Sequence, residues 1–244
     1  MTDNSGNRES HANRESGSKG RQSHPYIRRR GRFTKAQNRA LVEILPKIRL
    51  TPATMEGFRD QPVGIEIGFG MGQALVQWAQ NNPDWLLIGV ELYQPGIGSL
   101  AHQLNAQGIE NVFIAECAAE DLMQELPVSS LDEIRIYFPD PWPKKRHAKR
   151  RLIQAEFIGQ LAEVLRPGGV LKLATDWTPY ADWMREQFSL QPAFQKTLDA
   201  RRQAGSASDG IRQSTKFEQR GERLGHDIHD LHYISVNSAT TESR

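Results

Sequence analysis

Apolar and polar positions follow two patterns along the chain from residue 63 onward. Short apolar runs of strand length are separated by longer segments whose apolar residues recur at helical spacing. The run 86–92 is almost continuously apolar, which is typical of a strand covered on both faces. The pattern predicts strands at 63–69, 86–92, 112–115, 134–138 and 170–174, with helices at 72–80 and 95–107 between the first three.

Further helices are indicated by signals at their ends. Thr34 can act as the N-cap of a helix over Lys35–Glu43. A later helix is predicted to stop at 166–169, where the sequence Arg-Pro-Gly-Gly does not favour its continuation. Thr178-Pro179 begins another helix, with the proline in its first turn. The apolar face of the later helix is predicted to consist of Phe157, Ile158, Leu161, Val164 and Leu165.

This alternation of strands and helices predicts an α/β fold, with a parallel sheet and helices on both faces. Ligands of such sheets bind beyond the carboxyl ends of the strands, so the residues that close each strand are candidates for function. Glu91, Asp140 and Asp176 follow three of the five predicted strands. Glu116, near Ala118, is a fourth candidate acid at a strand end.

The segment 66–72, Glu-Ile-Gly-Phe-Gly-Met-Gly, follows the first strand and opens a helix. Gly68 and Gly70 let the backbone turn sharply and let a ligand approach closely. Glu91 lies 23 residues after Gly68, where a carboxylate can accept hydrogen bonds from both hydroxyls of a ribose. The Gly-x-Gly-x-Gly spacing favours S-adenosylmethionine (SAM) over a dinucleotide, and so does Glu66. A carboxylate there would repel a pyrophosphate, whereas SAM carries a sulfonium and an ammonium group.

The segment 138–143, Phe-Pro-Asp-Pro-Trp-Pro, is the most unusual one in the chain. Its prolines fix φ and hold the residues before them extended, so Asp140 is presented on a stiff loop at a strand end. Rigid placement suits a reacting group, and Trp142 can stack on a base. The segment 144–151 follows at once and carries six Lys or Arg in eight residues. The two segments together predict a site for RNA with an accessible single-stranded base.

The distribution of charge also indicates a polyanionic partner. The 244 residues carry a net charge of +2, but residues 1–35 hold nine Lys or Arg against three Asp or Glu. That local balance of +6 leaves −4 for the rest of the chain, in which 144–151 is strongly basic. Residues 1–30 are polar and are predicted to form a disordered basic arm, followed by one domain at 31–237 and a tail at 238–244.

Cysteine content and hydropathy bear on the compartment. Cys117 is the one cysteine, so no intrachain disulfide can form, and no apolar run approaches the roughly 18 residues of a membrane helix. We therefore expect a cytoplasmic protein with no membrane partner. His226, His229 and His232 are spaced by three, but without cysteine ligands beside them they do not predict a metal site.

Several motifs in combination resemble one known family, the bacterial tRNA (guanine-N7-)-methyltransferases. They are Glu-Ile-Gly-Phe-Gly-Met-Gly at 66–72, Phe-Pro-Asp-Pro-Trp at 138–142, the basic run 144–151, Ala-Thr-Asp-Trp at 174–177 and Thr-Lys-Phe-Glu-Gln-Arg-Gly at 215–221. The resemblance extends from about residue 28 to residue 233, with the motifs in the same order. It implies a class I SAM-dependent fold, with a mostly parallel seven-stranded sheet, and methylation of N7 of a guanosine in the tRNA variable loop.

The resemblance also implies roles for individual residues. Glu66, Glu91 and the end of the third strand would bind SAM, together with the glycines 68 and 70, and Asp140 would serve both SAM binding and catalysis. The residues assigned to substrate are Lys144, Asp176, Thr215, Lys216, Phe217 and Glu218. Those assigned to RNA are Arg146, His147, Ala148, Lys149, Arg150 and Arg151.

One position departs from the family. Where Ala118 stands, the family commonly has Asp or Asn, whose side chain hydrogen-bonds the adenine amine of SAM. The backbone of Ala118, or the side chain of Glu116 or Glu120, is a candidate replacement.

Two other function classes are compatible with parts of the sequence. They are a non-catalytic RNA-binding protein on a degenerate methyltransferase fold and a nicotinamide-dependent oxidoreductase. The intact acids Glu66, Glu91 and Asp140 argue against a non-catalytic RNA-binding protein. A nicotinamide-dependent oxidoreductase would leave the basic run 144–151 without a function. For the assembly, we expect a monomer or a homodimer.

Overall fold

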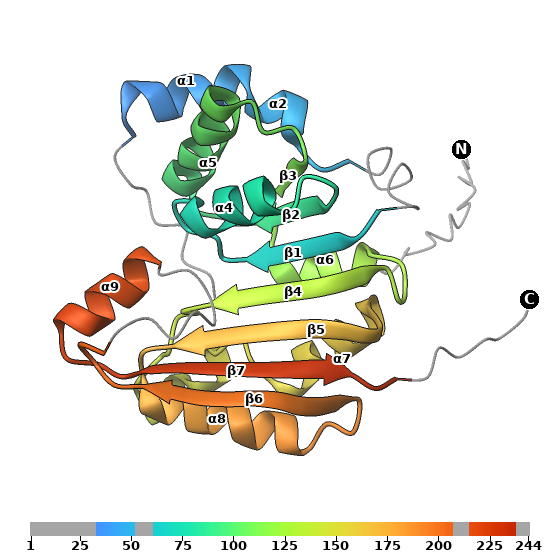
Figure 1. Cartoon of the computed structure of the whole chain (residues 1–244), viewed down its shortest axis with the longest axis vertical. Coiled ribbons are helices and arrows are strands. Elements are labelled where there is room, and N and C mark those ends of the chain that lie inside the picture. Colours follow the sequence, from blue (N-terminus) through green and yellow to red (C-terminus); the bar gives the residue numbers. More distant parts are fainter. Residues whose placement is uncertain (1–32, 52–60, 207–214, 238–244) are drawn as a thin grey trace, which may run out of the picture.

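The computed structural model describes residues 33–51, 61–206 and 215–237, and these contain a seven-stranded sheet in the order β3-β2-β1-β4-β5-β7-β6 (Figure 1). Strands β1 to β5 run parallel, whereas β7 is antiparallel to both of its neighbours, β5 and β6. The predicted mostly parallel α/β sheet is therefore confirmed. The predicted basic arm at 1–30 and the tail at 238–244 lie outside the described residues. The strands are β1 Val63–Ile67, β2 Leu86–Val90, β3 Val112–Ala115, β4 Leu131–Tyr137, β5 Leu165–Thr175, β6 Phe194–Arg202 and β7 Ile228–Ser235.

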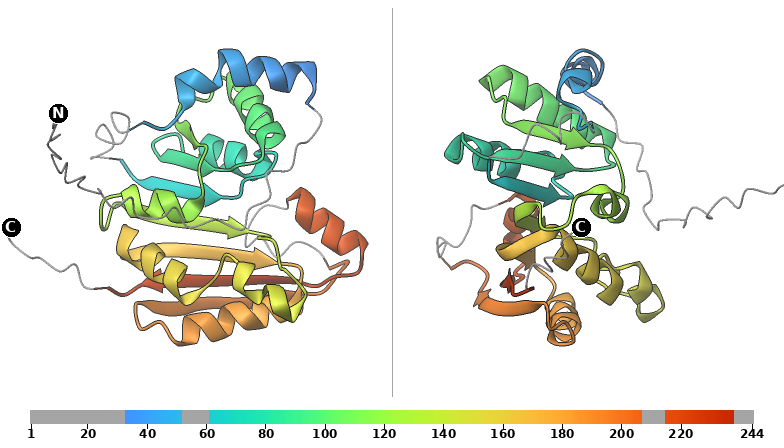
Figure 2. Two further views of the ribbon diagram at one scale, coloured as in Figure 1. Left: turned by 180° about the vertical axis from the view of Figure 1, so that it is seen from behind. Right: turned by 90° about the vertical axis from the view of Figure 1, so that its right-hand side faces the viewer.

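Helices cover both faces of the sheet, as predicted. Apolar side chains of α4, α5, α1 and α2 pack on one face, and those of α6, α7 and α8 pack on the other. Figure 2 shows α4 and α5 on one side of the strands and α6 and α7 on the other. The helices are α1 Lys35–Glu43, α2 Leu45–Ile48, α4 Gln73–Asn81, α5 Gln94–Gln107, α6 Ala119–Glu125, α7 Ala155–Val164, α8 Thr178–Ser189 and α9 Lys216–Arg223, with a 3-10 helix η1 at Lys145–Arg150.

The N-cap of α1 follows the sequence prediction. The Thr34 hydroxyl accepts a hydrogen bond from the Gln37 amide at 3.2 Å, and the Gln37 side chain accepts one from the Thr34 amide at 2.8 Å. This reciprocal pair satisfies two amides that the first helical turn leaves without partners. Buried Ala40 on this helix joins the apolar cluster formed by α4 and α5.

The predicted boundary between α7 and β5 is wrong. Leu165 does not continue the helical face but begins β5, where it pairs with Leu131 of β4. The register then shifts, so that Val170 pairs with Glu133. The Arg-Pro-Gly-Gly segment at 166–169 is thus an irregularity inside the strand and does not end a helix. Gly168 there adopts a positive φ of 82°, which a β-bulge accommodates. The β4 strand also starts at Leu131, three residues earlier than predicted.

The connection from β6 to β7 brings α9 to a position that the sequence pattern did not predict. Figure 1 shows α9 at the edge of the sheet to which β1, β4 and β5 point. Since this edge collects the carboxyl ends of the parallel strands, α9 lies where a ligand of such a sheet is expected. Among the described residues, no helix is both long enough and apolar enough to cross a lipid bilayer.

Gly64 lets α4 pack closely on the first strand. A Cβ built on Gly64 would overlap the Trp78 ring and would lie 2.9 Å from a Leu87 methyl carbon. We predict that Gly64→Ala destabilises the chain by about 1–3 kcal/mol, because added core volume forces neighbours to shift. Gly159→Ala in α7 is the matched control, since nothing lies within 4 Å of its built Cβ and alanine favours a helix by about 1 kcal/mol. Chemical denaturation measures both, and equal midpoints would contradict the packing account.

Candidate functional site

The loop after β1 is held in a conformation that requires glycine. Gly68, Gly70 and Gly72 have φ values of 73°, 56° and 84°, which side chains rarely adopt. The Gly68 amide donates to the Val90 carbonyl at 2.8 Å, so the loop begins fixed to the end of β2. Gly72 then serves as the N-cap of α4. The predicted glycine turn between a strand and a helix is confirmed.

Glu91 joins this loop to the end of β2. One carboxylate oxygen accepts from the Gly70 amide at 3.0 Å, and the other accepts from the Leu92 and Tyr93 amides at 2.8 and 3.0 Å. Burial raises the pKa of Glu91, the three backbone hydrogen bonds oppose that rise, and the charge of Asp140 adds to it.

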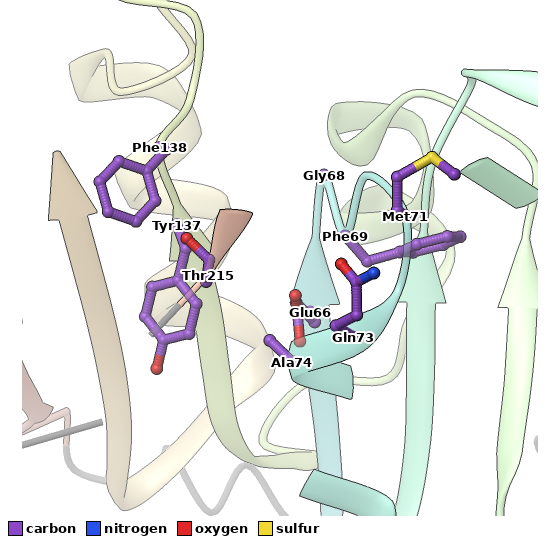
Figure 3. A pocket seen from close by; sticks show the side chains of 9 residues that line it. All are labelled: Glu66, Gly68, Phe69, Met71, Gln73, Ala74, Tyr137, Phe138 and Thr215. Carbon is purple, nitrogen blue, oxygen red and sulfur yellow. The ribbon is translucent and has the colours of Figure 1, made fainter. Parts of the chain in front are cut away.

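A pocket of about 410 Å³, which includes space open to solvent, lies beside the glycine loop (Figure 3). In Figure 3 the Glu66 carboxylate lies between Gln73 on one side and Tyr137 with Thr215 on the other. Residues from β1, α4, the end of β4 and the start of α9 therefore share one cavity. The lining consists of Glu66, Gly68, Phe69, Met71, Gln73, Ala74, Tyr137, Phe138 and Thr215.

Glu66 is a buried carboxylate that needs a further partner. Glu66 is 3% exposed, and its Oε2 atom has no hydrogen-bond partner among the described residues. Burial raises the pKa of Glu66 to about 7, opposed by the positive charge of Arg135, which lies opposite Glu66 in the register of neighbouring β4. A ligand that supplies cationic N–H donors would satisfy this atom, because an unpaired buried acceptor carries the full cost of desolvation.

Asp140 lies on the loop that leaves β4. Phe138 and Trp142 have φ values of 53° and 44°, and the Phe138 amide donates to the Ala174 carbonyl at 2.8 Å. Asp140 itself is exposed. The edge of the His147 ring contacts the Trp142 ring at 5.7 Å between centroids, and the Arg150 guanidinium lies 5.0 Å from the same ring. The stiff loop and the basic run are thus neighbours in space as well as in sequence.

The basic run forms the 3-10 helix η1, and most of it faces solvent. The side chains of Lys144, Arg146, Lys149 and Arg150 are exposed, while His147 and Ala148 are half-buried. Arg151 departs from its predicted place on this face: it is 9% exposed and its Nε donates to the Pro141 carbonyl at 3.0 Å. Its guanidinium is committed to the protein interior, which the sequence could not show.

The start of α9 contributes the other predicted substrate residues. The Thr215 hydroxyl accepts from the Glu218 amide at 3.1 Å, and the Glu218 carboxylate accepts from the Thr215 amide at 3.3 Å. Buried Glu218 also pairs with Arg202, at the end of β6. Sequence reasoning missed Arg202, because β6 lacked a recognisable strand pattern. The side chains of Lys216 and Phe217 lie outside the described residues.

Asp176, at the end of β5, is also placed beside α9. Its Oδ2 atom lies 3.2 Å from His226 Nδ1, and a Cβ on Gly221 would come within 2.8 Å of the same oxygen. Asp176 therefore supports the far end of α9, while Thr215 reaches the pocket at the near end.

At the end of β3, the acidic side chain of Glu116 is already engaged in contacts within the protein. The Glu116 carboxylate accepts from the Gln94 side chain and pairs with Arg49 at 3.3 Å. Ala118 is buried and begins α6. Of the candidates to replace a polar side chain at position 118, Glu116 already has two partners.

Comparison with known proteins places this architecture in a defined group. A family model described as "Putative methyltransferase" matches residues 60–231. A tRNA (guanine-N(7)-)-methyltransferase from Halorhodospira halophila is 42% identical over 221 residues, covering 87% of this chain and 95% of that protein. A protein of the same name from Chromohalobacter salexigens is 41% identical over 218 residues, covering 86% of this chain and 89% of that protein.

Solved structures share the fold at lower identity. The 16S rRNA methyltransferase KamB aligns with a TM-score of 0.58 and 17% identity, covering 78% of this chain and 95% of that chain. A variant of a 16S rRNA (adenine(1408)-N(1))-methyltransferase from Catenulisporales acidiphilia, with cosubstrate SAM, aligns with a TM-score of 0.51 and 17% identity. It covers 78% of this chain and 93% of that chain.

The raised pKa of Glu66 makes a prediction for stability. An unfolded glutamate has an ordinary pKa of 4.5, whereas Glu66 in the native state keeps its proton up to about pH 7. The native state therefore loses stability as the pH rises from 4.5 to about 7. We predict that Glu66→Gln is more stable than the wild type at pH 8, on the order of 1–3 kcal/mol, and that this difference vanishes below pH 4.5. Denaturant unfolding across this range tests it, with Glu163→Gln, at an exposed position on α7, as the control. A difference that does not change with pH would contradict it.

Proposed function

Because this chain belongs to the tRNA (guanine-N(7)-)-methyltransferase family, we propose that it transfers a methyl group from SAM to N7 of a guanosine in the variable loop of tRNA. One observation carries the proposal beyond family membership. A pocket that contains an unsatisfied buried carboxylate, Glu66, opens between strand ends, and the loop that carries Asp140 and the exposed cations of η1 leaves the same edge of the sheet.

The residues of the pocket fit SAM. Glu66, in the pocket lining, offers an unpaired acceptor to N–H donors. Glu91 does not line the pocket but accepts from Gly70 in the adjoining loop, after β2, where ribose hydroxyls are bound in this fold class. SAM supplies an electrophilic methyl group on a positively charged sulfur. Two carboxylates beside the glycine loop favour such a cation and disfavour the pyrophosphate of a dinucleotide. The nicotinamide-dependent oxidoreductase is therefore the weaker alternative.

The chemistry asks for placement rather than for a strong base. N7 of guanine carries an exposed lone pair, so no proton has to leave before the N–C bond forms and the C–S bond breaks. Asp140 serves by accepting hydrogen bonds from the guanine N–H donors and by stabilising the positive charge that develops on the ring. The stiff loop around Asp140 supports this role, because it limits the positions that the carboxylate can take.

The RNA side of the site is formed by η1 and α9. Exposed Lys149, Arg150 and their neighbours provide charges for phosphates, and Trp142 lies next to them as a stacking surface. Thr215 lines the pocket, which supports a role for it in contacting the base or its ribose. Phosphate contacts of this kind fix the register of the tRNA while the pocket selects the base.

The direct test is methyl transfer from labelled SAM to unfractionated tRNA, followed by cleavage chemistry specific for N7-methylguanosine. The proposal predicts label in tRNA and strand cleavage in the variable loop. Binding of tRNA without transfer would favour a non-catalytic RNA-binding protein. Label at a different base or a different atom would contradict the proposed reaction.

Asp140 provides a prediction for the rate. We expect Asp140→Ala to lower the single-turnover rate of transfer by about 10²–10³, because a group aimed at developing charge contributes mostly in the transition state. Asp182→Ala on α8 is the matched control, since this exposed carboxylate pairs only with Arg185 among the described contacts. Rapid-quench measurement at saturating tRNA and SAM gives both rates. Near-normal turnover by the Asp140 variant would remove it from the mechanism.

The exposed cations predict a salt dependence for tRNA binding. We expect Lys149→Gln to weaken binding and to reduce the slope of log K against log salt by about one, as for the loss of one phosphate contact. Lys47→Gln is the control, because exposed Lys47 lies on α2, which packs beside the edge strand β3 and away from α9 (Figure 1). Filter binding between about 50 and 200 mM salt measures the slopes. An unchanged slope for the Lys149 variant would contradict an RNA face on η1.

A further inference from the structure

We infer that Arg151 is a positioning residue that holds the Asp140 loop in place, and that it is not one of the cations that contact RNA. The inference rests on the proposed function of Asp140. Arg151 is the last residue of the basic run, but its environment differs from that of the others. Lys149 and Arg150 are exposed, whereas Arg151 is 9% exposed.

The contacts of Arg151 point inward to the catalytic loop and to α8. Its Nε donates to the Pro141 carbonyl at 3.0 Å, and Pro141 directly follows Asp140. Its guanidinium carbon lies 5.5, 5.4 and 4.9 Å from the ring centroids of Trp177, Tyr180 and Trp183. Distances within about 6 Å of an aromatic face give favourable cation–π interactions.

The aromatic residues around Arg151 are themselves fixed. Tyr180 is fully buried, and its hydroxyl accepts from the Ile153 amide at 3.4 Å. Trp183 donates from Nε1 to the Ile153 carbonyl at 2.7 Å. These bonds attach the chain just after Arg151 to α8, so the guanidinium bridges a rigid helix and the Pro141 carbonyl.

Asp140 lies within electrostatic reach of this cluster. Burial raises the pKa of Tyr180, and the negative charge of Asp140 contributes to that rise. The geometric link is shorter, since Asp140 directly precedes Pro141, whose carbonyl accepts from Arg151. Because the flanking prolines leave the loop few free torsions, one hydrogen bond at Pro141 is enough to set the position of Asp140. A misplacement of about 1 Å can lower a rate roughly 10²-fold.

Two substitutions separate this role from a phosphate contact. Arg151→Lys keeps a charge that binds phosphate well, but it lacks the planar guanidinium and the Nε donor. Arg151→Met fills the aromatic surroundings without a charge and should still fold, because apolar residues often replace buried ions without loss of stability. Lys149→Gln, at an exposed position in the same helix, is the contrasting variant.

The experiment measures single-turnover methyl transfer at saturating tRNA and SAM, tRNA binding against salt, and thermal unfolding. We expect Arg151→Lys and Arg151→Met to lower the rate by about 10- to 100-fold, with tRNA affinity and salt slope equal to the wild type. Lys149→Gln should instead weaken the affinity for tRNA and reduce the salt slope. Lys47→Gln, at an exposed position on α2 outside the site, is the control for an unchanged rate.

Three results would overturn the inference. The first is a wild-type rate in both Arg151 variants. The second is a salt slope reduced by about one in Arg151→Met, which would identify a phosphate contact. The third is a loss of rate that follows only a lowered unfolding temperature in both variants, which would make Arg151 a general stability residue. If the wild-type chain itself transfers no methyl group, the proposed function is refuted. That result differs from the three above, in which only the Arg151 variants depart from expectation.

Discussion

The three backbone hydrogen bonds to the Glu91 carboxylate are the interaction on which the site depends. They connect the loop after β1, through Gly70, to the chain that leaves β2, through Leu92 and Tyr93. Parallel pairing brings the strand ends to one edge, and the Glu91 carboxylate, together with the Gly68 amide that donates to Val90, fixes how the two loops face each other. Glu66 then lies buried below the loop with an oxygen left for a ligand.

The opposite wall of the site is held by a different set of contacts. The Arg151 guanidinium ties the loop after β4 to α8, and Arg202 ties the start of α9 to β6 through Glu218. Both arginines are buried, and each is paired with groups from another element. The pocket is therefore built from loops that are individually stiffened and then joined to the core. Such an arrangement suits a reaction that needs alignment more than proton transfer.

Local sequence signals predicted what depends on local physics. Apolar runs located β1 to β5 within a few residues, and the glycine spacing located the turn before α4. The count of seven strands came from the family resemblance. The apolar pattern did not predict β6, because most of its residues are exposed or half-exposed and it lacks an alternating core pattern. Leu165 was misassigned because an apolar residue after a helix fits either a helical face or a buried strand.

The site residues were predictable by type but not by environment. Glu66 lies near the end of β1, and Glu91 and Asp140 follow the two strands that pair with it in parallel, so all three belong to one edge of the sheet. Of the three, only Glu66 lines the described pocket. The separation of Arg151 from the other cations depends on three aromatic residues of α8 and the chain before it, which are 26 to 32 positions away in sequence. No local pattern records such a contact.

The most direct measurement is calorimetric titration of SAM into the full chain and its Glu91→Gln variant. The account predicts one SAM per chain for the wild type. In the variant, the affinity for SAM should be weaker by about 10- to 100-fold. The reason is that an amide nitrogen would face backbone N–H groups that now donate to the carboxylate. Equal affinities for SAM, or binding of a nicotinamide dinucleotide in its place, would contradict it.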